Sequence, residues 1–137
     1  MSSALEPARR HAEDVQPLLD RQSRVMLIDA PRPVPILAAV GAVGQILDIL
    51  LSNAVRHGTG TVLVRVTADE RRATLDVEDA GPGIAPDAVD RLFETGDASD
   101  GHGIGLALAR TLVITEGGTI TLVRARPPVM RVEFPLA

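Results

Sequence analysis

The sequence contains neither lysine nor cysteine, and each absence excludes particular kinds of site. All 14 basic residues are arginine. A Walker-type phosphate lysine, a Schiff base and the strand lysine of eukaryotic-type protein kinases are therefore excluded. Without cysteine, the chain can form no disulfides, thiolate zinc sites or cysteine nucleophiles.

Aromatic residues and positive charge are also scarce. Two Phe, with no Trp or Tyr, leave little for stacking on bases or sugars. A net charge of −4 provides no basic excess to hold nucleic-acid phosphates. No apolar run reaches the roughly 18 residues of a membrane-spanning helix, and the opening MSSALEPARR lacks the charged-then-apolar order of a signal peptide. We therefore expect a soluble fragment without direct nucleic-acid or membrane contact.

The length and apolar content, 137 residues and 45%, fit one globular domain with one core. Alternating apolar and polar residues predict an antiparallel hairpin over residues 61–67 and 73–79, with Leu75 and Val77 facing inward. The other predicted elements are a helix or frayed segment over 8–20, strands over 24–29, 119–126 and 129–135, an edge strand in PRPVPIL and a short helix over 86–93.

The helix predicted over residues 45–58 contains an unusual polar residue. Its apolar positions recur at helical spacing: Ile46, Leu47, Leu50, Leu51, Ala54 and Val55. Asn53 lies within this run, and a carboxamide facing an apolar interior costs free energy unless its donors and acceptor are satisfied. Either the fold satisfies it, which is the commoner case for a single Asn, or a ligand does.

Two glycine-containing motifs follow that helix. DAGPGI, at residues 79–84, comes at the end of a predicted strand and could be turn chemistry alone. GHGIGL, at residues 101–106, follows a small polar segment and precedes an apolar helix. Free backbone amides at a helix start can bind an anion, although such glycines also serve close packing. Each motif alone is a weak signal.

Together, these motifs resemble the ATP-binding catalytic domain of bacterial sensor histidine kinases, of the GHKL superfamily and Bergerat fold. The matching elements, in order, are NxxRHG, DxGxGI, LF, GxGxGL and a final GG. The resemblance implies an α+β fold, a two-layer α/β sandwich with a mixed, mostly antiparallel sheet of about five strands and about three helices on one face. Residues 1–11 would be an N-terminal tail or linker, and residues 12–137 the catalytic domain.

The resemblance also implies roles for residues at the adenine end of a nucleotide site. Asp79 would accept a hydrogen bond from the exocyclic amine of adenine, where guanine has a carbonyl. Gly81 and Gly83 would leave room for the base. Ile84 completes this motif as a nucleotide-binding residue.

At the phosphate end, Asn53 is the implied Mg²⁺ ligand and, with Arg56, the implied catalytic residue. The backbone amides of the second glycine motif would be directed at the phosphates of ATP. The remaining implied nucleotide contacts are His57, Gly101, His102, Gly103, Ile104, Gly105 and Leu106. ATP and Mg²⁺ are therefore the implied cofactors.

The implied activity is transfer of the γ-phosphoryl group of Mg-ATP to a histidine on a separate dimerisation and phosphoacceptor domain. That domain would lie on another chain or in an upstream segment, and a response regulator would be served indirectly. Without it the catalytic domain is not expected to be competent. The implied location is cytoplasmic, either alone or as the cytoplasmic part of a membrane-bound sensor.

Two alternatives to the sensor kinase remain open. One is an anti-sigma-factor serine kinase of the same superfamily, and the other is a non-catalytic nucleotide-binding docking module. Ile49 stands four residues before Asn53, where sensor kinases usually carry a second Asn and gyrase-type ATPases a catalytic Glu. An Ile cannot act as a base, which argues against autonomous ATP hydrolysis.

Overall fold

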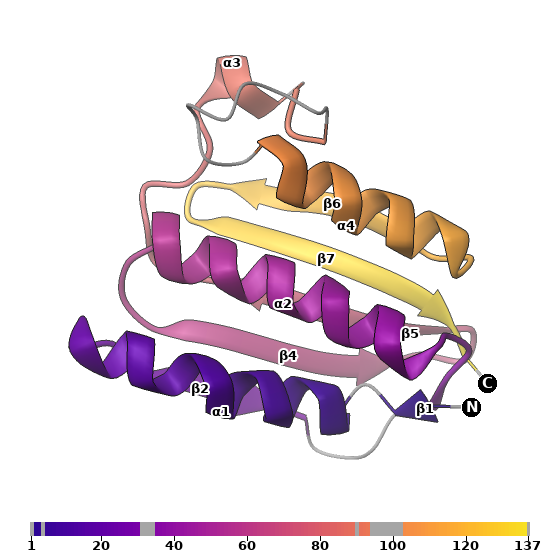
Figure 1. The fold of residues 1–137 in the computed structure, drawn as a ribbon. Coiled ribbons are helices and arrows are strands. Elements are labelled where there is room, and N and C mark those ends of the chain that lie inside the picture. The colour runs from indigo at the N-terminus through magenta and orange to yellow at the C-terminus, as the bar shows by residue number, and fades with distance from the viewer. Residues whose placement is uncertain (1, 4, 31–34, 90, 94–102, 137) are drawn as a thin grey trace.

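The computed structural model of the chain describes residues 2–3, 5–30, 35–89, 91–93 and 103–136 (Figure 1). In chain order the elements are β1 (Ser2–Ser3), α1 (Leu5–Arg21), β2 (Met26–Asp29), β3 (Pro35–Ile36), α2 (Val40–His57), β4 (Val62–Ala68), β5 (Arg72–Glu78), α3 (Pro86–Val89), α4 (Gly103–Thr115), β6 (Thr119–Ala125) and β7 (Pro128–Pro135). Within the described part, no helix is both long and apolar enough to cross a membrane.

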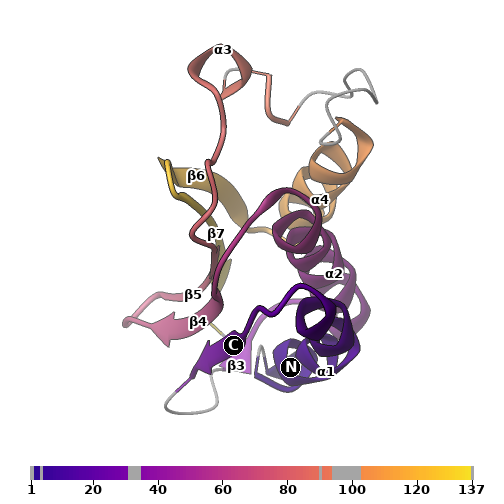
Figure 2. The ribbon, with the colours of Figure 1, turned by 90° about the vertical axis from the view of Figure 1, so that its left-hand side faces the viewer.

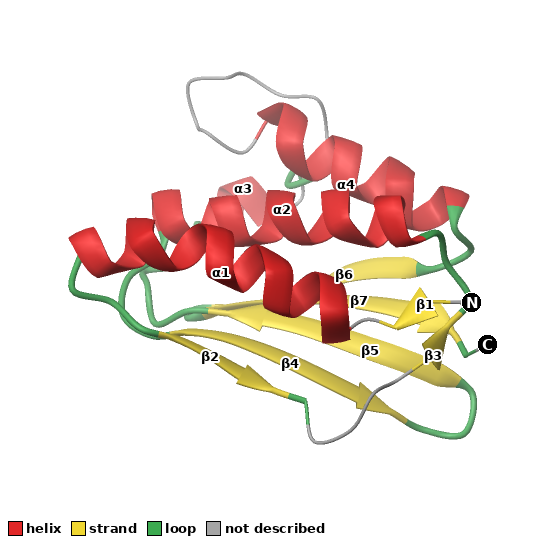
Figure 3. Cartoon of the chain, turned by 60° about the horizontal axis from the view of Figure 1, so that its bottom comes forward, coloured by secondary structure: helices red, strands yellow, loops and turns green. Residues whose placement is uncertain are grey.

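The main sheet has five strands in the order β2-β4-β5-β7-β6. β2 runs parallel to β4, and the other neighbouring pairs are antiparallel. Helices α1, α2 and α4 lie together over one face of this sheet (Figure 3). The predicted two-layer α+β sandwich with a mixed, mostly antiparallel sheet is confirmed. β1 and β3 form a separate small pair that the sequence did not predict.

The core lies between the helices and the sheet. Strand residues facing the helices alternate with residues facing away, because successive side chains of a strand point to opposite faces. On α2, five residues of the predicted apolar stripe are buried, and Val55 is partly buried. The deeply buried side chains of α2 and the sheet include Ile46, Leu47, Leu51, Val62, Val64 and Val66, each at most 1% exposed. Leu75 and Val77 also face the core, as predicted.

Helix α2 begins at Val40, five residues before the predicted start at Gln45. Its N-cap residue, Ala39, makes no side-chain hydrogen bond to the helix, so the sequence carries no capping signal there. Two glycines, Gly41 and Gly44, also lower the helix propensity of these turns. Val43 is fully buried. Packing of this residue stabilises turns that local sequence disfavours.

Helix α1 is a full helix that includes Pro17, rather than a frayed segment. Proline removes one backbone hydrogen bond, but Val15 and Leu19 anchor the helix, at 5% and 0% exposed. The helix runs through the boundary expected between residues 11 and 12. The division into a tail of residues 1–11 and a domain of residues 12–137 stays a prediction.

The segment between β5 and α4 differs from the prediction in its helices. Helix α3 covers only the single turn Pro86–Val89, and residues 91–93 form a turn in which the N–H groups of Arg91 and Leu92 donate to Ala88 O and Val89 O. Leu92 is nevertheless buried against the core, at 4% exposed. The small polar segment expected over 94–100 lies outside the described residues. Helix α4 begins at Gly103, so it takes in the second half of the GHGIGL motif.

The sheet face turned away from the helices carries an ionic row: Asp29, Arg65, Asp76 and Arg131. These four residues are aligned in register across β2, β4, β5 and β7. The Arg131 guanidinium donates to both Asp76 oxygens, at 2.9 and 3.0 Å. Arg65 Nε donates to Asp29 Oδ2 at 3.1 Å. The charges on this face are thus paired across neighbouring strands.

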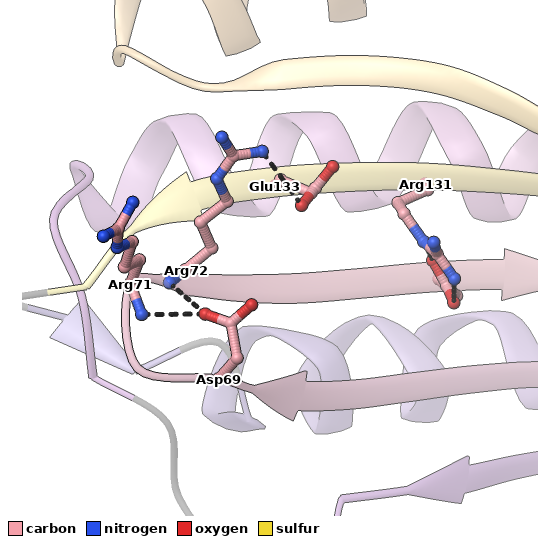
Figure 4. Close-up of polar contacts among 6 residues, drawn as sticks. Asp69, Arg71, Arg72, Arg131 and Glu133 are labelled. Atoms are coloured by element: carbon pink, nitrogen blue, oxygen red, sulfur yellow. Dashed lines mark hydrogen bonds and ion pairs between the residues drawn. The ribbon is translucent and has the colours of Figure 1, made fainter.

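The turn between β4 and β5 is fixed by a carboxylate (Figure 4). Asp69 Oδ1 accepts the backbone N–H groups of Arg71 and Arg72, at 2.7 and 2.8 Å. These two hydrogen bonds lower the pKa of Asp69 below its ordinary value. Arg72 also pairs with Glu133 of β7 at 3.5 Å. The turn therefore forms where the sequence predicted it, at the Arg71-Arg72 pair.

Candidate functional site

A pocket lies between α2, the start of α4 and the sheet, beyond the end of β5. Helices α2 and α4 contact each other along the same sheet face (Figures 1 and 2). Three polar residues line the pocket: Asn53, His57 and Asp79. The remaining lining residues are Leu50, Ala54, Gly58, Val77, Gly83, Ile84, Leu106, Leu122, Pro128 and Met130. A mostly apolar pocket with a few polar groups suits a flat, partly polar ligand.

Asp79 is the acidic group of this pocket, and it directly follows β5. Its Oδ1 accepts the backbone N–H of Gly81 at 2.7 Å, and the backbone N–H of Thr59 also donates to the carboxylate. Burial raises the pKa of Asp79 above its ordinary value, while these two N–H groups and the charge of Arg24 oppose the rise. No salt bridge reaches Asp79 within the described residues. The carboxylate is therefore held by backbone and remains available to a ligand.

Gly58 and Gly81 leave room for the Asp79 carboxylate because they have no Cβ atom. A Cβ at Gly58 would lie 2.5 Å from Asp79 Cγ, and one at Gly81 would lie 2.7 Å from Asp79 Oδ1. Gly81 does not line the pocket, so its demonstrated role is to let the chain fold around Asp79. That Gly81 also leaves room for a base stays a prediction.

Gly83 lines the pocket and is fixed by its backbone. Its φ is +77°, which L side chains rarely adopt, and a Cβ there would collide with the backbone oxygen of Ala125 at the end of β6. The N–H of Ile84 donates to that same oxygen at 3.0 Å. The motif thus crosses close to the β6–β7 connection, and this crossing places Gly83 and Ile84 on the pocket wall.

The three predicted residues of α2 occupy different environments. Asn53 is half-buried and lines the pocket, rather than being enclosed in the core, and its side chain makes no hydrogen bond to the chain among the described residues. His57 is exposed and also lines the pocket. Arg56 is exposed and outside the lining. The pocket therefore brings together Asn53 and His57, with Arg56 next to them in sequence on the last turn of α2.

The second glycine motif meets the pocket at the start of α4. Gly103 and Ile104 form the first residues of this helix, and Leu106 is buried and lines the pocket. A Cβ at Gly105 would meet only Ile49 Cγ2, at 3.5 Å. Gly101 and His102 lie outside the described residues. The first backbone N–H groups of a helix lack intrahelical acceptors, so this terminus can bind an anion.

Sequence reasoning missed two parts of the site. One is the apolar wall from the sheet, formed by Val77, Leu122 and Met130. Each of these residues is an ordinary inward-facing strand residue, so its sequence carries no functional signal. The other is Arg24, which is only 8% exposed and donates to the end of α2. Arg24 supports the site from outside the pocket lining, in the connection before β2 rather than in the strand predicted over 24–29. A buried arginine cannot be distinguished from an exposed one by its neighbours in the sequence.

The described residues do not form a metal site by themselves. No three His, Cys, Asp or Glu side chains among them are grouped closely enough to hold an ion. Asn53 places an amide oxygen in the pocket that has no hydrogen-bond partner in the described part of the chain. A Mg²⁺ ion there would fit only as an ion shared with oxygens of a bound ligand.

Residues 39–137 match the family model described as histidine kinase-, DNA gyrase B- and HSP90-like ATPase. The chain is 40% identical to the sensor protein RstB of Escherichia coli K12 over 84 residues, 56% of this chain and 19% of RstB. It is 35% identical to the sensor histidine kinase component HK1 of Mycobacterium tuberculosis H37Rv over 104 residues, 61% of this chain and 62% of HK1. The chain thus spans less than two thirds of either relative.

Solved structures agree with this match. Full-length ShkA in complex with AMPPNP superposes with a TM-score of 0.85 at 33% identity, over 96% of this chain and 30% of ShkA. The catalytic domain of the histidine kinase ThkA gives a TM-score of 0.87 over 96% of this chain and 92% of that one; at 20% identity it supports the fold alone. The chain belongs to the histidine kinase-, DNA gyrase B- and HSP90-like ATPase family and is an ATP-binding catalytic domain of the sensor histidine kinase type.

Proposed function

We propose that this chain binds Mg-ATP in the pocket beside Asp79 and donates the γ-phosphoryl group to a histidine of a separate dimerisation and phosphoacceptor domain, in two-component signalling. The observation that carries the proposal is the Asp79 carboxylate, which is half-buried, is held by two backbone N–H groups and forms no salt bridge with any residue that the structure describes. A carboxylate in that state is poised to accept a hydrogen bond from a ligand.

The adenine end of ATP would lie against the apolar wall, with its exocyclic amine donating to Asp79. Val77, Met130 and Leu122 supply a dry surface for the flat base. Guanine carries a carbonyl instead of the amine, so its oxygen would face the oxygens of Asp79. Because a buried polar group without a partner is costly, the pocket would reject guanine.

The phosphate end would lie between the last turns of α2 and the start of α4. Asn53 would bind the Mg²⁺ ion through its amide oxygen, together with phosphate oxygens, and Mg²⁺ would screen the phosphate charge. Arg56 and His57 would contact phosphate oxygens, and the N–H groups at the start of α4 would add neutral donors. This arrangement would supply what a lysine supplies in other nucleotide sites.

The phosphoacceptor would come from outside this chain. Of its three histidines, His57 lines the pocket, His11 lies on α1 and His102 is outside the described residues. A histidine beside the bound phosphates is placed to contact them rather than to attack in line with the leaving oxygen. A response regulator would then receive the phosphoryl group from the acceptor domain. The two curated relatives reported above are named a sensor protein and a sensor histidine kinase component, so neither a serine kinase nor a non-catalytic docking module is favoured.

Nucleotide titrations test the binding half of this proposal. Calorimetry with ADP, with and without Mg²⁺, should show a gain in affinity when Mg²⁺ is added. Asp79→Ala should lose roughly 1–3 kcal/mol of ADP binding, because the adenine amine loses its acceptor. Asn53→Ala should lose the Mg²⁺-dependent gain and keep the metal-free affinity. Wild-type ADP affinity in Asp79→Ala would reject this role of Asp79.

A phosphotransfer assay tests the catalytic half. With γ-labelled ATP, acid-labile phosphate should form on a supplied histidine-bearing domain and not on this chain alone. Label that forms on this chain alone and disappears in His11→Gln would show a self-contained kinase and contradict the proposal. Binding without any transfer to the supplied domain would instead favour a docking module.

A further inference from the structure

Arg24 is a buried arginine that lies outside the catalytic pocket and outside the residues matched by the family model, which begin at residue 39. It is 8% exposed, in the connection between α1 and β2. A buried guanidinium is costly unless its donors are satisfied. The contacts that satisfy it therefore indicate what Arg24 does.

Those contacts join the end of α2 to the turn that follows it. Arg24 Nη2 donates to Ala54 O at 3.0 Å, and Nη1 donates to Val55 O at 3.2 Å. Its Nε donates to Gly60 O at 2.9 Å. The last carbonyls of a helix have few intrahelical donors, and positive charge is favoured at that end. Ala54 O also accepts the backbone N–H of Gly58 at 3.1 Å, so Arg24 is its second donor. Arg24 thus caps α2 from a distant part of the chain and fixes residues 58–60 against it.

The turn that Arg24 fixes is the turn that holds Asp79. The backbone N–H of Thr59 donates to the Asp79 carboxylate. Thr59 O accepts the backbone N–H of Ala80 at 2.9 Å, so the two turns are joined in both directions. The positive charge of Arg24 also lowers the pKa of Asp79, against the opposing effect of burial. Both geometry and charge therefore connect Arg24 to the carboxylate in the pocket.

We propose that Arg24 is a positioning residue for adenine recognition: it locks the end of α2 to the turn at residues 58–60, so that the Asp79 carboxylate is held in place beside the pocket. This role rests on the proposed function, because it requires Asp79 to read the adenine amine. Arg24 does not itself line the pocket, and it contacts the lining residue Ala54 only at the backbone oxygen. It would act on the ligand indirectly, through Thr59 and Asp79.

The test compares ADP with IDP, which differ at the base position that Asp79 would read. Affinities of both nucleotides would be measured by calorimetry for wild type, Arg24→Lys, Arg24→Met and Val66→Ala. Val66 is 1% exposed on β4 and does not line the pocket, so Val66→Ala is a control for general loss of stability. ADP binding would also be followed from neutral to acidic pH.

We expect wild type to prefer ADP over IDP by about tenfold or more, since a polar group is left unpaired with IDP. Arg24→Met should reduce the preference for ADP to about threefold or less, because residues of one hydrogen-bond network couple energetically. The preference of Arg24→Lys should fall between those of wild type and Arg24→Met. The acid midpoint of ADP binding should move to higher pH in Arg24→Met, where the favourable charge is lost, and stay in place in Arg24→Lys. Val66→Ala should keep both the preference and the midpoint.

Different results would overturn the proposed function and the role of Arg24. If wild type does not distinguish ADP from IDP, the proposed function fails and the role of Arg24 fails with it. If wild type distinguishes them and folded Arg24 variants keep both the preference and the midpoint, Arg24 only supports the fold. Should Arg24→Met not fold, Arg24→Lys decides: an unchanged ADP preference overturns the proposal.

Discussion

Asp76 and Asp79 are three residues apart, and their carboxylates lie on opposite sides of the same sheet with different partners. Asp76 is 5% exposed, and both its oxygens accept hydrogen bonds from Arg131. Asp79 is half-buried, and only backbone N–H groups hold it directly. The side chains of β5 alternate between the faces, so Asp76 falls in the ionic row and Asp79, beyond the strand end, falls beside the pocket.

The difference separates a carboxylate that is paired within the fold from one that remains available to a ligand. The paired carboxylate of Asp76 raises the pKa of Arg131, as expected where two charges stabilise each other. Burial raises the pKa of Asp79, so its ionised form is disfavoured in the folded chain. A carboxylate that is kept available for a ligand therefore costs the folded state stability, whereas a paired one does not.

The largest effect is expected from the pocket backbone, at Gly83→Ala. The substitution places a Cβ against Ala125 O at a φ of +77°, so the free energy of unfolding should fall by about 2–4 kcal/mol. Urea unfolding followed by circular dichroism measures this. Ala85→Gly, at an exposed position two residues on, is the control for changing the loop composition. An unchanged midpoint would mean that the loop moves freely away from β6.

Asp79→Asn should change stability and affinity in opposite directions. Its free energy of unfolding at pH 7 should be equal to or above that of wild type, because a disfavoured charge is removed while an oxygen remains for Gly81. ADP affinity should fall by about 1–3 kcal/mol, because the amide oxygen stays with the Gly81 N–H and the amide NH2 then faces the adenine amine, donor against donor. Parallel losses in both measurements would show that Asp79 is structural, like Asp76.

The pH dependence of stability sharpens the same contrast. The folded-state pKa of Asp79 lies above its ordinary value of 3.8. Its contribution to stability is therefore greatest below pH 3.8 and is lost as the pH rises through the raised value. Over that window, the difference in stability between Asp79→Asn and wild type should grow with pH. If this difference in stability instead shrank with rising pH, folding would lower the pKa of Asp79 rather than raise it.

Asp76→Asn should show the converse of Asp79→Asn. Loss of the charged acceptor from Arg131, whose side chain is 39% exposed, should cost about 1–2 kcal/mol of unfolding free energy. ADP affinity should be unchanged. A double-mutant cycle with Arg131→Met isolates the pair, because its coupling energy should account for most of the loss. A change in ADP affinity would mean that the two faces of the sheet are coupled.

The smallest change in stability is expected from Gly105→Ala. A Cβ there meets only Ile49 Cγ2 at an ordinary distance of 3.5 Å, so stability should change by less than about 0.5 kcal/mol. A fall in ATP affinity without a fall in stability would support the predicted contact between this helix start and the phosphates. Unchanged ATP affinity would mean that only other residues of the GHGIGL motif contact the phosphates.

The sequence by itself determined the elements and the family. Period-two alternation predicted the β4–β5 hairpin and the inward direction of Leu75 and Val77. Helical spacing predicted the buried stripe of α2. The ordered motifs predicted the fold of the sensor kinase catalytic domain. These properties depend on local periodicity and on backbone demands within a few residues, which a sequence states directly.

Only the tertiary structure decided which charges are paired. Asp76 meets Arg131 across 55 positions, and Arg24 meets Ala54 across 30. The early start of α2 likewise depends on the burial of Val43, not on a cap. Strand order and register set such contacts, and neither is encoded by a residue's neighbours in the chain. The sequence therefore predicted Asp79 as a site residue, but only the fold distinguishes it physically from Asp76 and connects it to Arg24.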